Sequence, residues 1–426
     1  MKILLLTYAV SPYRGSEYSV AWNHITQIAK NHQVTVLYGT SGAHIGDDDD
    51  MRDFHKRRKI DNVEWHRVLP SNLTNSFNFF NKKGYFTYSF YVAYRRWHKD
   101  VYDYCKSNIN VDDFDVVHFQ SPIGYREPGY LWKLGLPYLW GPIGGANSLD
   151  SRLLSALPKS GKVKLLIRKV LNLFQLRYSF RLKKALKATD LLLTATTENQ
   201  DVFETIHGVK SVYLPENGTI GEYLGEIKHR ECTDKVNLIW IGSIDARKAL
   251  RLLIDSFEYI DDPHVFTVHV LGNGPLKDDL TAYAEERGLG SVFVWHGHIS
   301  RKQVLETIQN ADLHVITSVS EANTTVIWES IQNGVPTMSL DHCGMRDIIS
   351  ENSGIKVKLA DYPKLVESFG RALDNISKDK RILTELVPGV KESFYKYHWD
   401  KRVVLFDDLY EKAIKNWQSK NSIKNI

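Results

Sequence analysis

Glu321 and Glu329 stand eight positions apart, and each carries a carboxylate that could bind hydroxyl groups. A carboxylate accepts paired hydrogen bonds from vicinal hydroxyls, so the pair suits two hydroxyl-bearing rings, one on either side of a phosphate. Around them the pattern predicts a strand ending near Thr317, a short loop, and a helix capped by Asn323 or Thr324. Free N–H groups at such a helix start attract phosphate. These residues therefore predict a site for a ligand that combines hydroxyls with phosphate groups.

The elements that would position this site alternate between strand and helix along the chain. The apolar run Lys2–Tyr8, the helical spacing over Glu17–Lys30 and the run Val34–Tyr38 form one βαβ unit, which predicts a parallel sheet with right-handed crossovers. Further strands are predicted at Val116–Phe119, Tyr138–Trp140, Leu191–Thr194 and Val212–Leu214, and then at Val236–Ile241, Val265–Leu271, Val292–His296, Leu313–Thr317 and Thr337–Leu340. The fold class is therefore α/β, with two Rossmann-like, doubly wound parallel sheets in succession.

The boundary between the two domains is expected between Pro215 and Lys235, where a Pro-Glu-Asn-Gly turn opens an irregular stretch. This gives an N-terminal domain over residues 1–215 and a C-terminal domain over residues 216–395. Residues 396–426 are expected to form an amphipathic helix that packs back on the N-terminal domain. Its predicted apolar stripe consists of Val403, Leu405, Phe406, Leu409, Tyr410 and Ile414.

The segment over residues 318–347 resembles glycosyltransferase family 4 in its E-x7-E pair, which is followed by N-G-x-P, a strand and a Gly-bearing turn. The resemblance implies a retaining enzyme of the GT-B type, whose two domains face a central cleft. It further implies that Glu321 contacts the sugar of a nucleotide-sugar donor and that Glu329 contacts the ribose. The backbone between them would hold the sugar or phosphate through Asn323, Thr324 and Thr325.

A second match is WIGSIDARKAL, which resembles the strand-loop-helix motif of the same family and contains Gly242. The resemblance implies that Lys248 neutralises the diphosphate as it leaves the sugar. The arginine expected in this motif falls on Ser243, which cannot supply that charge. Arg247, beside Lys248, could supply it from a different backbone position.

Two more glycine-bearing turns are similar to those of the family. LGNGPLKDDL places Gly272 and Gly274 after a strand, on the side expected to bind the donor. SPYRGSE joins the first strand to the first helix, and Gly15 and Ser16 lie where the family has a Gly-rich loop near the donor phosphates. A G-x-G-x-x-G dinucleotide fingerprint is absent from the sequence, which argues against an NAD enzyme.

The first domain offers a weaker set of candidates. His118 ends the strand in DVVHFQ, where the resemblance implies a catalytic histidine facing the donor sugar. WGPIGGAN follows the next strand, and its glycines predict a tight turn. We expect acceptor contacts there from Gly144, Gly145 and Asn147.

Composition argues against several other classes of protein. The three cysteines lie far apart, which argues against a disulfide framework or a zinc site and favours a reducing compartment such as a cytoplasm. A net charge of +5 is mild, and no nucleic-acid-binding module appears. The acidic run Asp47–Asp50 is expected to be a solvated loop, so neither a metal ion nor another cofactor is expected. The apolar start of the chain is expected to be a buried strand rather than a signal peptide, and no apolar run is long enough to span a membrane.

One basic stretch could bring the protein to a membrane surface. Residues 152–187 contain many Lys and Arg, no Asp or Glu, and apolar residues at helical spacing. Such a segment can lie on anionic lipid at the inner face of the cytoplasmic membrane, or be a packed helix with a solvated rim. The aromatic stretch Phe77–Trp97, with Arg95 and Arg96, could do the same or form an acceptor loop.

Taken with the resemblance, these features predict transfer of a sugar from a nucleotide-sugar to a hydroxyl of a glycan or lipid-linked acceptor, in polysaccharide or glycolipid assembly. Two alternatives remain open. One is a GT-B relative that epimerises or phosphorolyses sugars. The other is a weakly active or non-catalytic partner subunit, which the serine at position 243 suggests.

Overall fold

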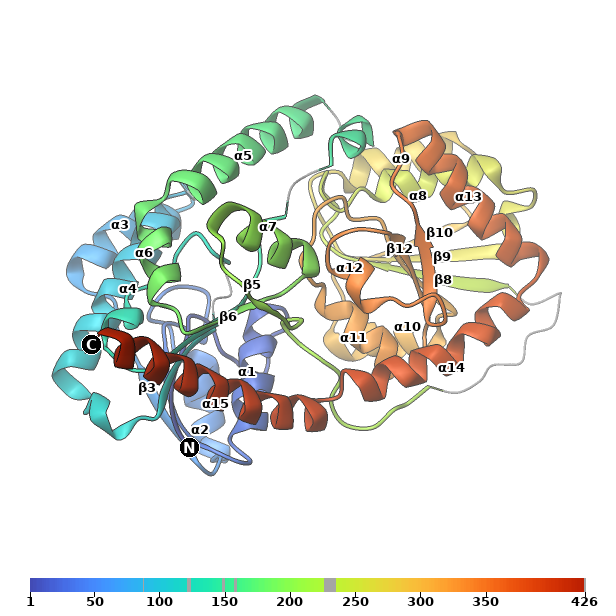
Figure 1. The fold of residues 1–426 in the computed structure, drawn as a ribbon. Coiled ribbons are helices and arrows are strands. Elements are labelled where there is room, and N and C mark those ends of the chain that lie inside the picture. The colour runs from blue at the N-terminus through green and yellow to red at the C-terminus, as the bar shows by residue number, and fades with distance from the viewer. Residues whose placement is uncertain (87, 121–123, 148–149, 157–158, 226–234, 425–426) are drawn as a thin grey trace. The chain divides into compact units, whose positions relative to one another are not determined.

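The computed structural model describes residues 1–426 apart from 87, 121–123, 148–149, 157–158, 226–234 and 425–426 (Figure 1). The chain forms two compact units. Unit 1 comprises Met1–Ala146, Leu173–Asn217 and Trp399–Ile426, and unit 2 comprises Asn147–Asn172 and Gly218–His398.

The described residues of unit 1 form a parallel sheet of seven strands in the order β3-β2-β1-β4-β5-β6-β7. The strands are β1 (Lys2–Thr7), β2 (Gln33–Tyr38), β3 (Val63–Arg67), β4 (Val116–Gln120), β5 (Tyr138–Ile143), β6 (Leu191–Thr194) and β7 (Val212–Tyr213). The helices are α1 (Glu17–Ile28), α2 (Asp49–Arg57), α3 (Asn72–Lys82), α4 (Ser89–Asn108), α6 (Phe180–Ala188), α7 (Thr197–His207) and α15 (Trp399–Lys424). The central strands are apolar on both faces because helices cover both sides of the sheet.

Unit 2 is built on a parallel sheet of six strands, counted over its described residues, in the order β10-β9-β8-β11-β12-β13. The strands are β8 (Val236–Ile241), β9 (Phe266–Leu271), β10 (Phe293–Gly297), β11 (Leu313–Ile316), β12 (Thr337–Leu340) and β13 (Gly354–Val357). The helices are α8 (Leu250–Ser256), α9 (Lys277–Glu286), α10 (Arg301–Asn310), α11 (Thr325–Gln332), α12 (Cys343–Ile348), α13 (Tyr362–Lys378) and α14 (Arg381–Lys396).

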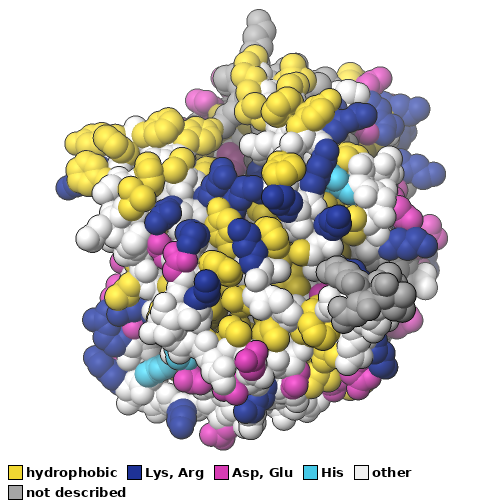
Figure 2. Space-filling view, turned by 60° about the vertical axis from the view of Figure 1, so that its left-hand side comes forward, with side chains coloured by type: hydrophobic (Ala, Val, Ile, Leu, Met, Phe, Trp, Pro, Cys, Tyr) yellow, Lys and Arg dark blue, Asp and Glu magenta, His cyan; other side chains and the backbone are white. Residues whose placement is uncertain are grey.

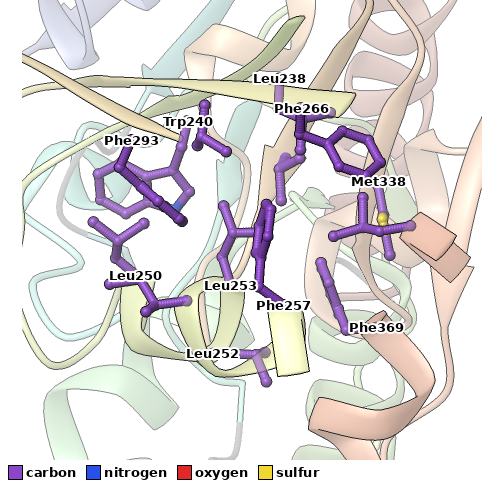
Figure 3. Packing of buried hydrophobic residues seen from close by; sticks show 14 of the residues in the cluster. Leu238, Trp240, Leu250, Leu252, Leu253, Phe257, Phe266, Phe293, Met338 and Phe369 are labelled. Atoms are coloured by element: carbon purple, nitrogen blue, oxygen red, sulfur yellow. The ribbon is translucent and has the colours of Figure 1, made fainter. Parts of the chain in front are cut away.

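The core of unit 2 lies between its sheet and helices α8 and α13. Figure 3 shows Trp240 of β8, Phe266 of β9, Leu253 of α8 and Phe369 of α13 as members of one cluster, and all four are almost completely buried. Burying side chains of this size contributes about 1.5–3 kcal/mol each. This core fixes the strand ends from which the candidate loops emerge.

Each sheet has one point at which the strand order reverses direction. In unit 1 the reversal lies between β1 and β4, and in unit 2 it lies between β8 and β11. In open parallel sheets, ligands bind outside the carboxyl ends of the strands at such a point, because the two flanking loops diverge there. Ligand-binding residues are therefore expected in the loops after β1, β4, β8 and β11.

The domain division differs from the sequence-based one over residues 147–172, which belong to unit 2 although they were expected within an N-terminal domain spanning 1–215. Leu153 is buried in the core of unit 2, and Nη1 of Arg152 donates to the carbonyl of Leu359 at 3.0 Å. The basic stretch 152–187 is also not one helix. It contains α5 (Lys159–Tyr178) and α6, which Ser179 separates by capping α6 through the N–H of Leu182.

The C-terminal helix α15 belongs to unit 1, where it contacts α1, β4, β5 and β6. It begins at Trp399 rather than at residue 396. Val403, Phe406, Leu409 and Tyr410 are buried on it, whereas Leu405, expected in the same stripe, is 37% exposed. The strands β3 and β13 were not anticipated from the sequence. No helix among the described residues is both long and apolar enough to cross a membrane.

Candidate active site

The loop after β8 delivers two cationic side chains to the switch point of unit 2. Asp245 accepts hydrogen bonds from the backbone N–H groups of Arg247 and Lys248, at 2.9 and 3.0 Å, and so fixes the turn that precedes α8. The Thr317 hydroxyl, at the end of β11, donates to the carbonyl of Lys248 at 2.6 Å. The loops after β8 and β11 are thus tied together through their backbones.

Glu321, from the loop after β11, lies between these two cations. Its Oε2 accepts from Nζ of Lys248 at 2.5 Å and from Nη1 of Arg247 at 2.7 Å. The side chains of Glu321, Lys248 and Arg247 are 18%, 12% and 30% exposed. Burial raises the pKa of Glu321, but the charges and hydrogen bonds of Lys248 and Arg247 outweigh this and hold it below its usual value. The cluster has one negative and two positive charges, so it attracts a further anion.

Glycines allow the backbone to close tightly around this cluster. A Cβ on Gly272, whose φ is +134°, would lie 1.9 Å from the carbonyl oxygen of Gly242. A Cβ on Gly274 would lie 2.4 Å from the carbonyl oxygen of Ile244. A Cβ on Gly242 would lie 3.3 Å from Cε of Lys248. These three glycines therefore allow close packing of the loop that carries Lys248.

The helix α11 starts beside Glu321, with its first residue at Thr325. Thr324 is the N-cap residue, but its side chain makes no capping hydrogen bond, which leaves the first N–H groups of the helix uncapped by it. A Cβ on Gly344 would lie 1.9 Å from the carbonyl oxygen of Ala322 and 2.3 Å from Oδ1 of Asn323. The start of α12 thus packs directly against the loop that holds Glu321.

Glu329 lies on α11 and pairs with a residue that was not identified from the sequence. Its Oε1 lies 2.8 Å from Nη2 of Arg301, which opens α10 after the loop that follows β10. The Glu329 side chain is 15% exposed and that of Arg301 is 59% exposed. Burial raises the pKa of Glu329, and the charge and hydrogen bond of Arg301 only partly oppose this. The one advance indication of Arg301 is its place directly after a strand-end loop.

In unit 1, the loop after β1 contains Gly15 and Ser16 and is exposed at both. Ser16 has φ +57° and ψ −139°, a conformation that favours glycine. Asp50 anchors this loop, accepting from the Ser11 hydroxyl and from Nε of Arg14, both at 2.6 Å. The sequence predicted that the acidic run Asp47–Asp50 is a solvated loop. It is not purely solvated, because Asp50 forms hydrogen bonds with the turn after β1. Among the described residues, no group of three or more His, Cys, Asp or Glu is arranged to hold a metal ion.

His118 is a core residue, which corrects its assignment as a catalytic group facing a ligand. It is completely buried, and its Nδ1 and Nε2 lie 2.9 Å from the Tyr410 hydroxyl and 2.7 Å from the Gly141 carbonyl. Burial lowers its pKa to about 4, so it is neutral near pH 7. A histidine with both nitrogens occupied joins β4, β5 and α15 and has no atom left for a substrate.

Gln120, two residues further along β4, is a second residue that was not identified from the sequence. It pairs with Thr7 at the carboxyl ends of β4 and β1, which is the switch point of unit 1. It is 5% exposed, and neither its Nε2 nor its Oε1 has a hydrogen-bond partner among the described residues. A buried amide without partners is costly, so its place at a ligand-binding edge favours a role in binding. In the sequence, the only sign that Gln120 could bind a ligand was its position at the end of a strand, two residues after His118.

We expect opposite consequences from substituting His118 and Gln120. Replacing His118 with Leu leaves the Tyr410 hydroxyl and the Gly141 carbonyl unpaired, and should lower the free energy of unfolding by about 1–3 kcal/mol. Replacing Gln120 with Ala removes no hydrogen bond and should leave stability within about 1 kcal/mol. Chemical denaturation of both variants measures this. Equal destabilisation by the two substitutions would contradict the distinction.

The acceptor-side residues do not fall into one unit. Gly144 and Gly145 belong to unit 1, and Asn147 belongs to unit 2. The carbonyl of Gly144 accepts from the N–H of Tyr125 at 3.3 Å, and a Cβ on Gly124 would lie 2.5 Å from that oxygen. Gly145 has φ +81°, which a residue with a side chain rarely adopts. The expected tight turn is present, and Gly124 packs against it.

Comparisons with known proteins agree with this geometry. Residues 226–387, within unit 2, match the family described as "Glycosyl transferases group 1". The uncharacterized glycosyltransferase MJ1607 of Methanocaldococcus jannaschii is 27% identical over 169 residues, which cover 39% of this chain and 42% of that protein. The matches cover less than half of the length of the first curated relatives, at 42%, 36% and 48%.

Two solved structures are similar over almost the whole chain. The lipopolysaccharide outer core galactosyltransferase WaaB in its apo form has a TM-score of 0.60 at 16% identity, covering 99% of this chain and 100% of that one. HepE of Anabaena in complex with UDP-glucose has a TM-score of 0.61 at 12% identity, covering 97% and 99%. At these identities the similarity establishes the fold, which is the GT-B arrangement of two parallel-sheet α/β domains.

Proposed function

We propose that this protein is a retaining glycosyltransferase of family 4, which moves a sugar from a nucleoside-diphosphate sugar to a hydroxyl of a glycan or lipid-linked acceptor. The observation that carries the proposal is the cluster of Glu321 with Lys248 and Arg247 at the switch point of unit 2. The match to group 1 glycosyl transferases over the same unit supports it, as does a structure of the same fold that holds UDP-glucose.

In this proposal the donor diphosphate binds beside Lys248 and Arg247, with the start of α11 supplying backbone N–H groups. These groups are fixed before the reaction and stabilise charge where it develops, on the departing diphosphate. Arg247 supplies the positive charge of the arginine that the family motif would place at Ser243. Glu321 orients the sugar and Glu329 accepts from the two ribose hydroxyls. The backbone of Asn323 lines the sugar.

The transfer itself needs no protein nucleophile in this scheme. The bond from the anomeric carbon to the phosphate oxygen breaks, and the acceptor oxygen bonds to the same face of that carbon. The acceptor proton passes to the departing phosphate oxygen. Lys248 and Arg247 supply the positive charge on the diphosphate, so the scheme requires neither a metal ion nor another cofactor.

The proposal extends to the place of action. Residues 152–187 carry no Asp or Glu, and α5 exposes Ile167, Val170 and Phe174 at 55%, 60% and 63%. A basic segment with exposed apolar residues suits the inner face of the cytoplasmic membrane, where a lipid-linked acceptor for polysaccharide or glycolipid assembly would be found.

The experiment that tests this function incubates the purified chain with UDP-, GDP- and ADP-sugars, a membrane extract as acceptor, and a chelator. We expect transfer of sugar from one donor, with the anomeric configuration of the product retained. Product without acceptor would instead indicate an epimerase, and dependence on free phosphate a phosphorylase. No turnover with any donor, despite nucleotide binding, would leave the partner-subunit alternative.

Arg301 gives this proposal a pH-dependent test. Glu329 accepts from ribose hydroxyls only as a carboxylate, and its pKa is already raised by burial. Replacing Arg301 with Met removes the opposing charge and raises this pKa further. Because protonation increases as pH falls, the affinity of the variant for nucleoside diphosphate should decrease with falling pH more steeply than that of the wild type, and from a higher pH. Calorimetric titration at a series of pH values measures the effect.

The matched control is Arg301→Lys, which retains the positive charge and should restore most of the wild-type pH profile. A profile that stays parallel to the wild type in Arg301→Met would show that Arg301 does not act through the protonation of Glu329.

A further inference from the structure

The α3–α4 hairpin of unit 1 has an unusual distribution of apolar residues. Helix α3 buries Thr74 and Asn78, whereas Phe77, Phe79 and Phe80 are 40%, 50% and 52% exposed. A helix on a soluble surface normally has the opposite arrangement, with its apolar stripe facing the core. About half of the surface of these phenylalanines is therefore open to solvent.

Polar contacts hold α3 in this orientation. Ser71 caps the helix by accepting from the N–H of Thr74, and the Thr74 hydroxyl donates to Oδ2 of Asp100 on α4 at 2.5 Å. The same carboxylate oxygen accepts from the N–H of Ser71 at 3.0 Å. The outward direction of the phenylalanines is thus fixed by hydrogen bonds at the inner face.

The exposed apolar surface continues through the turn into the first residues of α4. Tyr94 and Trp97 on α4 are buried in the core, but Tyr88, Tyr91 and Val92 at the start of the helix are exposed. The exposed members of the whole surface are Leu73, Phe77, Phe79, Phe80, Tyr85, Phe86, Tyr88, Tyr91 and Val92. Figure 2 looks onto the side of the molecule that carries α3 and α4, where hydrophobic side chains gather at the surface with Lys and Arg beside them. A contiguous apolar surface of this kind marks an interaction site.

The charged side chains of this stretch are basic up to Asp100, which faces the inner side of α3. Residues 65–99 contain no Asp or Glu. Lys82 and Lys83 lie at the turn and Arg95 lies on α4, all three exposed and without an ion pair among the described residues. Two copies of the same basic surface would repel each other, which disfavours self-association through it. A planar, negatively charged partner into which aromatic rings can insert fits both the exposed aromatic side chains and the basic charge.

We propose that the α3–α4 hairpin docks on an anionic lipid surface, with its Phe and Tyr side chains entering the interfacial region and Lys82, Lys83 and Arg95 facing lipid phosphates. Aromatic residues favour this depth, and basic side chains add attraction to anionic lipid. The inference rests on the geometry of unit 1 and is independent of the donor chemistry proposed for unit 2.

The experiment measures binding of the full chain to vesicles without any nucleotide or sugar. One set of vesicles contains phosphatidylcholine alone, and the other contains about 30% phosphatidylglycerol. We expect binding to the anionic vesicles and little to the neutral ones. The variant F79S/F80S should bind about 30-fold more weakly, since the exposed part of each ring no longer enters the apolar phase. The variant K82E/K83E should lose at least about 10-fold.

Two controls match these variants on surfaces elsewhere. L224S/Y395S removes two hydrophobic side chains that are each 50% exposed in unit 2, and K401E/K412E makes the same charge change on α15. Both should bind vesicles like the wild type. Equal losses in test and control variants, equal binding to neutral vesicles, or no vesicle binding at all would overturn the proposal. A wild-type dimer that F79S/F80S converts to a monomer, without vesicle binding, would assign the surface to a second copy instead. Unchanged thermal unfolding of the variants shows that these results do not come from misfolding.

Discussion

Replacing Glu321 with Gln is expected to lower the rate of sugar transfer by about 100- to 1000-fold while tightening the binding of nucleoside diphosphate by roughly 10-fold. The rate falls because an amide cannot support positive charge on the sugar in the transition state. Binding tightens because Lys248 and Arg247, which both hydrogen-bond to Glu321, then present their full charge to the diphosphate. Steady-state kinetics and calorimetry together measure the two effects.

The same substitution has a cost in stability. Two cations that are only 12% and 30% exposed lose the carboxylate between them, which should lower the free energy of unfolding by about 1–3 kcal/mol. The variant Glu367→Gln is the matched control, because Glu367 pairs with Arg371 at the surface of the same unit. It should change neither the rate nor the affinity. Near-normal transfer by Glu321→Gln would contradict the role assigned to this carboxylate.

Replacing Lys248 with Met is expected to change nucleoside diphosphate affinity in the opposite direction, weakening it by about 10- to 100-fold, and to lower transfer by about 100- to 1000-fold. Lys248 is the less exposed of the two cations, and its backbone is fixed by Asp245 and Thr317, so its charge is held in place before the diphosphate arrives. Arg247→Met should have a smaller effect, because the more exposed charge is better screened.

The control for Lys248→Met is Lys364→Met, which removes an exposed lysine from α13 of the same unit. It should bind nucleotide like the wild type. If Lys248→Met bound nucleoside diphosphate normally, the diphosphate would have to lie elsewhere, and the assignment of this lysine would be wrong.

Much of the fold could be predicted from the sequence, because buried parallel strands are continuous apolar runs. The strands Val236–Ile241 and Thr337–Leu340 were predicted with the bounds that the structure has. The strands β3 and β13 were missed because both lie at sheet edges and mix polar with apolar residues, as in Val-Glu-Trp-His-Arg of β3. Such edge strands lack the continuous apolar run from which buried strands are predicted.

The candidate site was predictable where it depends on local sequence. Glu321, Lys248 and Arg247 lie in loops that follow strands, and parallel strand ends meet at one edge of a sheet. The pairing of Glu329 with Arg301 was not predictable, since it joins two helices through side chains far apart in the sequence. His118 was misassigned because the pattern did not reveal that α15 would cover its face of the sheet.

The assignment of residues 147–172 to unit 2 also depends on contacts that no local pattern contains. Leu153 is buried among residues that lie some 80 to 230 positions further along the chain, and Arg152 reaches the carbonyl of Leu359. Sequence reasoning placed the boundary at the most irregular stretch and could not detect that an earlier segment crosses between the units.

The central claim is that Lys248 binds the donor diphosphate and that Glu321, paired with this lysine, offsets part of its charge and orients the sugar. The most direct test is calorimetric titration of UDP, GDP and ADP, without metal ions, into the wild type, Lys248→Met and Glu321→Gln. We expect one of the three nucleotides to bind the wild type, to bind Lys248→Met more weakly, and to bind Glu321→Gln more tightly. Binding of none of the three, or changes of the same sign in both variants, would contradict the claim.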